Sequence, residues 1–219
     1  IQETLDSEDE AAYVVSEIKK RLEEGVPGEQ IAVLFRVHTD ARALAGQLVK
    51  QKIPFFMRDS MPDLYQHFIA KDIRAYLRLA GGGRNRADFL QVMNRPVRYL
   101  SRESLPEGRT VAFEDLRKFY CDKEWMQDRI DQFEWDLKML EKMAPYAAVQ
   151  YLRKKMGYED YLRGYAESKA VQPSEYLDVL GELEESARPF ASREQWIDHM
   201  QEYTQALKEQ KQKIQEQKT

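Results

Sequence analysis

Residues 31–42, IAVLFRVHTDAR, decide the fold prediction for the N-terminal part of the chain. Five apolar residues run without interruption, an arginine follows at once, and Thr39 then opens an amphipathic segment. A short apolar run bounded in this way predicts a buried strand, because it is too short for a typical helix. Arg36 would then lie at the carboxyl edge of an open sheet beside a helix N-terminus, where α/β proteins hold phosphate groups.

The pair Phe35 and Arg36 has two interpretations. An arginine at such an edge can reach a γ-phosphate, and an adjacent aromatic ring can stack on a base. Alternatively, Arg36 is a surface residue that pairs with Asp40, and Phe35 packs in the core. The residues alone leave both possibilities open.

The composition limits the class of protein. The chain has 219 residues, of which 33% are charged, and its formal net charge is −4. This balance is typical of a mostly helical soluble protein with one large or two small domains. No apolar run approaches the roughly 18 residues that span a bilayer, so we expect no membrane contact.

The side chains that bind metals or form disulfides are few. The single cysteine, Cys121, excludes an internal disulfide framework and favours a reducing, cytoplasmic setting. The histidines (His38, His67 and His199) lack metal-ligand spacing, and we therefore predict no metal site.

The periodicity of apolar residues changes after residue 57. Before it, a helix from Ser7, a strand at 31–35, a helix from Thr39 and a strand at 53–57 follow one another. Beyond it, helices are predicted at residues 64–79, 87–93, 113–143 (as one helix or two), 145–157, 158–167, 174–186 and 192–211. The predicted fold class is therefore mainly α, with a partial α/β segment at the N-terminus.

The tryptophans and the C-terminal residues complete this prediction. Trp125, Trp135 and Trp196 lie on apolar helical stripes, and we expect all three in the core. Residues 209–219 have almost no apolar content and are expected to fray.

Basic residues are concentrated in one part of this acidic chain. From Lys71 to Arg102 there are eight basic residues and two acidic ones. Such a cluster predicts salt-dependent contact with a nucleic-acid backbone, whereas the alternative is a solvated turn around a buried tyrosine. The candidate DNA-binding residues are Arg84, Arg86, Arg95, Arg98 and Arg102.

At residues 31–42 the chain resembles the UvrD/Rep/PcrA group of superfamily 1 DNA helicases. The family pattern is an apolar strand, an aromatic–arginine pair and a helix with a further arginine, which Phe35, Arg36 and Arg42 match. The likeness continues through three further blocks, KIPFF (52–56), KDIRAYLRLA (71–80) and FLQVMNRPVR (89–98).

This resemblance implies a domain organisation. Residues 1–58 would belong to the RecA-like domain 2A, residues 59–208 would form the helical 2B subdomain inserted in it, and 209–219 would be a polar tail. Arg36 would contact the ATP γ-phosphate from across the domain cleft. Phe35 would stand where the family has a tyrosine that stacks on adenine.

The resemblance also implies cofactors and partners. ATP and Mg²⁺ would act in the full-length protein together with a RecA-like domain 1A that is missing here, and the partner would be DNA at a single strand–duplex junction. Movement would run 3′ to 5′. The chain lacks a GxxxxGK[ST] loop and is not expected to hydrolyse ATP by itself.

One departure bears on the predicted DNA contact. The family loop reads Arg-Gly-Ile-Gly, whereas here the sequence is Arg98, Tyr99, Leu100 and Ser101. Without glycines the backbone is hindered from close approach to phosphate, so contact would depend on Arg95, Arg98 and Arg102. Two alternatives remain: a non-enzymatic helical protein-interaction module, or part of a superfamily 1 helicase–nuclease subunit.

Overall fold

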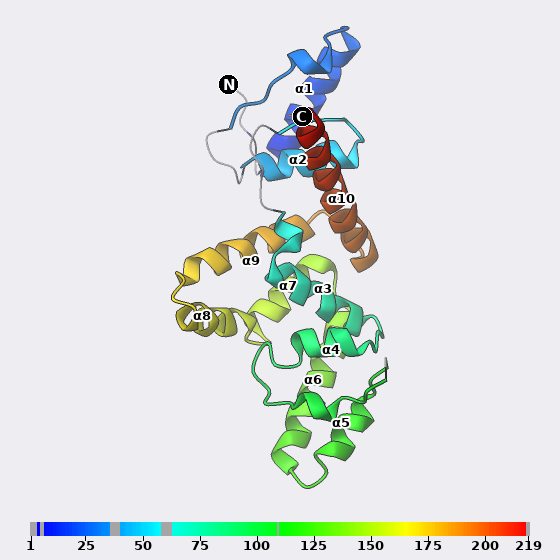
Figure 1. The fold of residues 1–219 in the computed structure, drawn as a ribbon, viewed down its shortest axis with the longest axis vertical. Coiled ribbons are helices and arrows are strands. Elements are labelled where there is room, and N and C mark those ends of the chain that lie inside the picture. Colours follow the sequence, from blue (N-terminus) through cyan, green and yellow to red (C-terminus); the bar gives the residue numbers. More distant parts are fainter. Residues whose placement is uncertain (1–3, 5–6, 36–39, 58–62, 109, 218–219) are drawn as a thin grey trace. The chain divides into compact units, whose positions relative to one another are not determined.

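The computed structural model describes residues 4, 7–35, 40–57, 63–108 and 110–217. The chain divides into two compact units. Unit 1 comprises Ile1–Asp63 together with Asp198–Thr219, and unit 2 comprises Leu64–Ile197. Helices dominate the described residues of both units, which confirms the predicted mainly α class (Figure 1).

In unit 1, helix α1 (Ser7–Glu23) packs against α2 (Asp40–Lys50). The 3₁₀ turn η1 (Gly28–Gln30) lies between them in the chain. Their shared core contains Ala11 and Val15 from α1 and Leu44 and Leu48 from α2. These residues recur at helical spacing, and the sequence predicted both helices.

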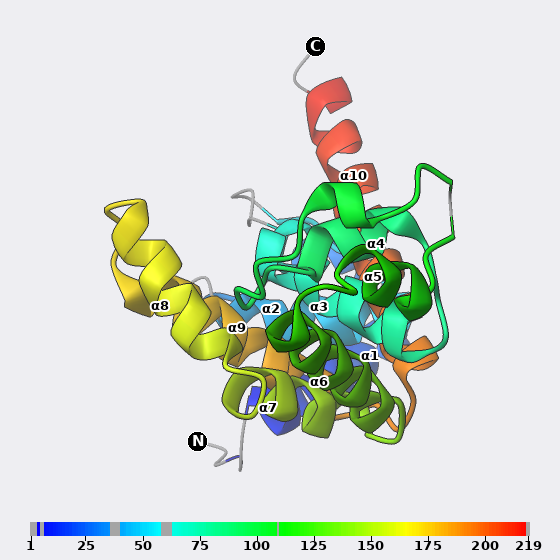
Figure 2. The same ribbon diagram turned by 90° about the horizontal axis from the view of Figure 1, so that it is seen from below.

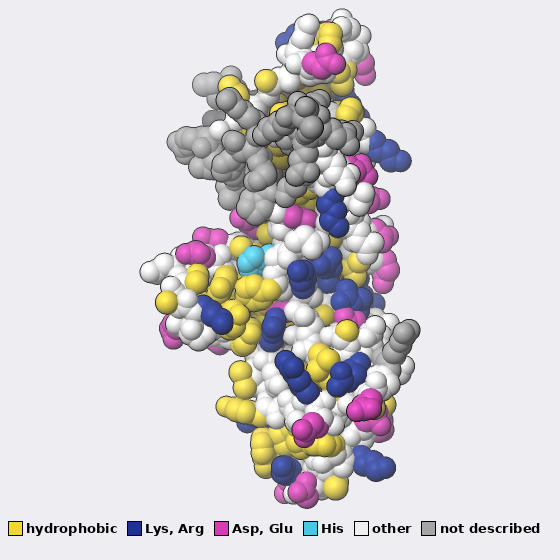
Figure 3. All heavy atoms as spheres, in the orientation of Figure 1, with side chains coloured by type: hydrophobic (Ala, Val, Ile, Leu, Met, Phe, Trp, Pro, Cys, Tyr) yellow, Lys and Arg dark blue, Asp and Glu magenta, His cyan; other side chains and the backbone are white. Residues whose placement is uncertain are grey.

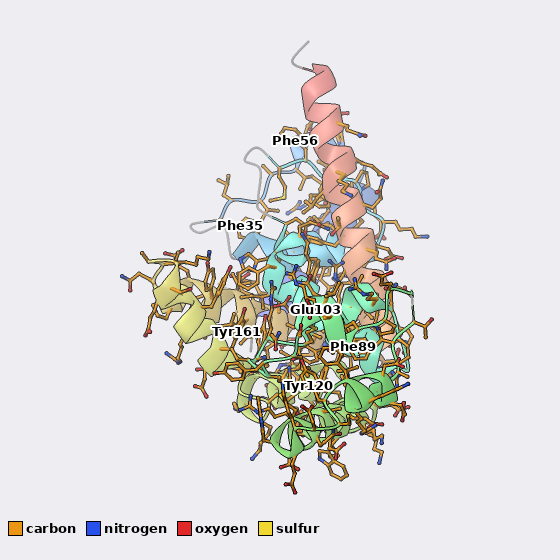
Figure 4. The ribbon with its side chains drawn as sticks, turned by 60° about the horizontal axis from the view of Figure 1, so that its bottom comes forward. Phe35, Phe56, Phe89, Glu103, Tyr120 and Tyr161 are labelled. Atoms are coloured by element: carbon orange, nitrogen blue, oxygen red, sulfur yellow. The ribbon has the colours of Figure 1, made fainter. Side chains whose placement is uncertain are left out.

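The two predicted strands of unit 1 are not strands in the described residues. Residues 31–35 and 53–57 have no helix and no ladder partner there. Leu34 is 93% exposed and Phe35 38%, so the prediction of a buried strand at 31–35 is wrong (Figure 4). A strand exists through hydrogen bonds to a neighbouring strand, and neither segment finds one among the described residues.

Residues 53–57 nevertheless keep the alternation of a strand. Ile53 and Phe55 pack against the core of α1 and α2, whereas Pro54 and Phe56 point to solvent, with Phe56 63% exposed. One face is therefore covered and the other exposed, as on the surface of a sheet. Alternate residues are thus covered and exposed here even though this segment pairs with no described strand.

Unit 2 is built around helix α3 (Phe68–Ala80), which packs against α4 (Arg86–Val92), α6 (Glu124–Glu141) and α9 (Pro173–Ala187). Helices α7 (Pro145–Lys154) and α8 (Tyr158–Ser168) pack against α9 and against each other. Helix α5 (Phe113–Phe119) lies beside α6 (Figure 2). The 3₁₀ turns η2 (Leu64–Gln66) and η3 (Arg102–Ser104) complete the unit.

Aromatic rings hold α3, α4, α5 and α6 together. The Phe133 ring meets Tyr76, Phe89 and Phe113 in T-shaped contacts, with centroid distances of 6.3, 6.1 and 5.6 Å. All four rings are buried, and Phe89 is labelled in Figure 4. Such edge-to-face pairs add to the stability that burial of the rings provides.

The segment 113–143 forms two helices, one of the two arrangements left open by its sequence. Of the tryptophans, Trp196 is fully buried as predicted, but Trp125 is 53% exposed and Trp135 57%. The core prediction is therefore wrong for these two. Helix α6 buries Met126, Ile130, Phe133 and Leu137 instead, and a single helix has only one face for the core.

Helix α10 (Arg193–Gln217) begins after Ser192, whose hydroxyl oxygen accepts a hydrogen bond from the Gln195 amide at 3.3 Å. The helix continues through Gln217, although the sequence analysis expects fraying from residue 209. Its last residues are Lys, Gln, Glu and Ile without Gly or Pro, and these have adequate to good helix propensity.

In unit 1, we expect His199 on α10 to make stability depend on pH. A Cβ placed on Gly46 would lie 3.7 Å from its ring, so the imidazole packs closely on α2. Burial, assisted by the positive charge of Lys50, lowers the pKa of His199 to about 4. The folded chain therefore keeps this ring neutral, whereas the unfolded chain protonates it near pH 6.5.

Acidification from pH 6.5 to pH 4 should accordingly favour the unfolded state, by at most about 3 kcal/mol from this group. The His199→Gln variant cannot take up this proton, and its melting temperature should fall less over the same range. Parallel pH profiles of the two proteins would contradict the assignment.

Candidate nucleic-acid interface

The candidate interface is the loop of residues 94–102, which joins α4 to η3 in unit 2. Asn94 fixes its shape: the side-chain amide donates to the Leu100 carbonyl at 2.7 Å, and its oxygen accepts from the Leu100 amide at 2.9 Å. The Ser101 amide donates to the Tyr120 hydroxyl at 2.6 Å. These bonds tie the loop to itself and to the C-terminal end of α5, so its conformation is set before any partner binds.

Arg98 lies inside this loop and not on its surface. It is 8% exposed, and its Nη1 donates to the Tyr76 hydroxyl at 3.1 Å and to the carbonyls of Val92, Met93 and Pro96 at 3.2 to 3.3 Å. The prediction that Arg98 contacts DNA is therefore wrong. A buried guanidinium needs hydrogen-bond acceptors, and here the Tyr76 hydroxyl and three backbone carbonyls accept from Nη1.

The charge of Arg98 is compensated by its surroundings. Its guanidinium lies 4.3 Å from the centroid of the Phe133 ring, a favourable cation–π geometry. The buried carboxyl of Asp136 interacts electrostatically with this charge. Burial raises the pKa of Asp136, and the Arg98 charge opposes that rise.

Arg95 belongs to a second polar network. Its Nη1 donates to both carboxylate oxygens of Asp72, at 2.9 and 3.2 Å, and the Tyr158 hydroxyl donates to the same carboxylate at 2.8 Å. Gln91 is a further donor to Asp72, which is fully buried. Burial raises the pKa of Asp72 although Arg95 opposes the rise, so Arg95 serves first as the partner of a buried carboxylate.

The other three candidate arginines differ in exposure. Arg84 is partly buried, donating to the Gly83 carbonyl at 2.8 Å and to that of Leu79 at 3.2 Å. Arg86 is the first residue of α4 and also partly buried, and its Nε is buried without a hydrogen bond in the described structure. Arg102 is exposed at the start of η3. Of the candidate arginines, Arg102 is therefore the one most available to a phosphate.

Further positive charge surrounds these residues. Figure 3 shows Lys and Arg side chains gathered on one face of unit 2, over α3 and α4. Lys71 and Arg78 of α3 are exposed, although Arg78 forms an ion pair with Asp88. The excess of basic residues seen in the sequence thus lies partly at the surface, while Arg98 is in the core.

The candidate ATP contacts lie in unit 1. Phe35 is described and 38% exposed. Arg36 lies outside the described residues, so its role stays a prediction. Among the described residues no cluster of three or more His, Cys, Asp or Glu side chains could hold a metal ion, and no helix there is long and apolar enough to cross a membrane.

The sequence as a whole matches one protein family. The UvrD-like helicase C-terminal domain matches residues 1–219, and the chain therefore belongs to that family. This confirms the coarser part of the resemblance noted at residues 31–42.

Curated relatives agree with this assignment. The chain is 26% identical over 204 residues to the putative ATP-dependent DNA helicase YjcD of Bacillus subtilis, covering 89% of this chain and 26% of that protein. It is 28% identical over 113 residues to the ATP-dependent DNA helicase PcrA of Staphylococcus epidermidis, covering 52% of this chain and 15% of that protein. It is 31% identical over 106 residues to DNA helicase II of Haemophilus influenzae, covering 48% and 14% respectively. The chain thus spans about a quarter or less of these relatives.

Because the two arginines of the same loop differ in burial, their substitutions should differ in the size of their effect on stability. Arg98→Ala should lower the free energy of unfolding by roughly 2–4 kcal/mol, because it removes the cation–π contact and the hydrogen bonds that Nη1 donates to the Met93 and Pro96 carbonyls. Arg102→Ala should change it by less than about 0.5 kcal/mol, because that side chain is exposed.

Urea unfolding followed by circular dichroism measures both variants against the unchanged chain. Equal midpoints for the two variants would contradict the buried role of Arg98.

Proposed function

We propose that this chain is part of an ATP-dependent DNA helicase and that unit 2 binds DNA at a single strand–duplex junction. The observation that carries the proposal is the family match along all of residues 1–219. The activity is taken from the relatives, which are named ATP-dependent DNA helicase and DNA helicase II.

The structure changes which residues carry the DNA part of the proposal. Arg98 is no longer a candidate for DNA contact because it is buried, and Arg95 forms an ion pair with Asp72. Arg102 remains as the exposed cation of a loop with a fixed shape, and the partly exposed Arg84 and Arg86 remain as further candidates. A cation on a fixed loop can position a DNA phosphate without reading the base sequence, as an enzyme that moves along DNA requires.

The remaining parts of the proposal follow the resemblance. Residues 1–58 would belong to the RecA-like domain 2A and residues 59–208 to the helical 2B subdomain, with movement along DNA from 3′ to 5′ in the cytoplasm. Arg36 would contact the γ-phosphate of ATP, and Phe35 would stack on the adenine. The sequence has no GxxxxGK[ST] loop to hold the phosphates and Mg²⁺, so a RecA-like domain 1A would supply these groups.

Junction binding by the chain tests the DNA role. Arg102→Ala should weaken binding of a duplex with a single-stranded tail and reduce the salt dependence of binding by about one phosphate contact. Arg188→Ala is the matched control, because it removes an equal charge from an exposed arginine of unit 2 that is bound to Glu185. Fluorescence anisotropy at several salt concentrations measures both.

The two arginine variants separate the possible results. Loss confined to Arg102→Ala supports the proposed interface. The same loss in both variants would mean that only net charge matters, and absence of junction binding by the unchanged chain would favour a protein-interaction module instead.

The ATP role needs the full-length protein that contains these residues. Arg36→Ala there should lower kcat for ATP hydrolysis at least about 100-fold while unfolding is unchanged, because an arginine on the γ-phosphate stabilises the charge of the transition state. Arg21→Ala serves as the control, because Arg21 is an exposed arginine of α1 that forms an ion pair with Glu24. Normal ATP hydrolysis by the Arg36 variant would mean that Arg36 is a surface residue without a role in ATP hydrolysis.

A further inference from the structure

Three exposed or partly exposed side chains form a stacked group on unit 2. The guanidinium of Arg129, on α6, lies 4.9 Å from the centroid of the Tyr99 ring and 5.0 Å from that of Trp125. Tyr99 is 67% exposed and Trp125 53%. One arginine therefore bridges a ring from the 94–102 loop and a ring from the start of α6.

The loop is built to present Tyr99 to solvent. Exposure alternates along it, with Val97 at 55%, Arg98 at 8%, Tyr99 at 67% and Leu100 at 3%. The two buried residues act as anchors on either side of Tyr99. Arg129 also donates to the Arg98 carbonyl at 3.3 Å, which joins the stacked group to the buried arginine.

The backbone at Tyr99 is strained. Its φ of +60° lies in the left-handed region, which a bulky residue adopts only when its surroundings enforce it. The hydrogen bonds of Asn94 on both sides of Tyr99 supply that enforcement. The fold thus holds the backbone of an aromatic residue in an unfavourable conformation and leaves its ring exposed.

The chemistry of the group selects a flat, uncharged partner. Two aromatic rings joined by a guanidinium plane offer stacking and cation–π contact, which nucleobases accept regardless of sequence. Glu124 and Asp128 are exposed next to Trp125 and Arg129 in the chain and disfavour a phosphate directly over the rings. Arg102 follows three residues after Tyr99 and can take the phosphate instead.

We propose that Tyr99, Trp125 and Arg129 form a stacking platform for an exposed nucleobase of DNA, either an unpaired base or the terminal base pair at a junction. This inference rests on the proposal that unit 2 binds DNA. It assigns base contact to aromatic side chains, separately from phosphate contact by Arg102. Figure 3 shows hydrophobic side chains exposed at the end of unit 2 formed by α5 and α6.

The test uses a duplex with a single-stranded tail that carries 2-aminopurine at the junction. Tyr99→Asn removes the ring and keeps a residue that tolerates positive φ, and Trp125→Ala removes the second ring without touching the loop backbone. Each should weaken binding about tenfold and reduce the quenching of 2-aminopurine, with an unchanged salt slope. Tyr99→Phe keeps the ring and should bind like the unchanged chain.

Trp135→Ala is the matched control, because Trp135 is an exposed tryptophan of the same helix that belongs to no ring contact among the described residues. It should leave binding and quenching unchanged. Melting temperatures of all variants establish that they are folded before binding is compared.

Two results would overturn the inference, and they are distinguishable. If the chain binds the junction through Arg102 but the Tyr99 and Trp125 variants bind and quench normally, the platform is wrong while the DNA role stands, and the rings become a candidate protein contact. If the unchanged chain binds no junction, the proposed function fails and the platform with it.

Discussion

The contacts of the buried Arg98 guanidinium are the interactions on which the candidate interface depends. Its bonds to the carbonyls of Val92, Met93 and Pro96 join the end of α4 to the loop, and its contact with Phe133 joins the loop to α6. The same residue presents its own carbonyl to Arg129. A charge in the core thus sets the position of the residues that face solvent.

The helices were predictable from sequence, and the strands were not. Helices α1 to α9 satisfy most of their backbone hydrogen bonds within themselves, so apolar periodicity and helix-ending residues such as Gly25 and Pro96 locate them. A strand needs a partner that periodicity cannot provide. Residues 31–35 have the composition of a buried strand, yet Leu34 is 93% exposed because no described segment pairs with them.

The candidate site was predictable as a region but not residue by residue. Counting arginines located the surface near α3 and α4, because excess charge of one sign tends to lie where a charged partner binds. Counting cannot separate Arg98 from Arg102, since both belong to the same loop and differ only in which carbonyls and rings surround them. Trp125 was missed for a related reason: the face of α6 turned to the core is decided by Phe133 and Ile130.

Tyr99 shows how a departure from a family pattern can keep a shape and change its chemistry. The family loop that this segment resembles has glycine at this position, and glycine adopts a positive φ at little cost. Tyr99 has a φ of +60°, so the backbone keeps the conformation that glycine would adopt freely. The close backbone approach that glycine allows is lost, and a ring supported by Arg129 and Trp125 takes its place. On the proposal made above, a loop suited to phosphates through its amides would thereby become one suited to bases through its side chains.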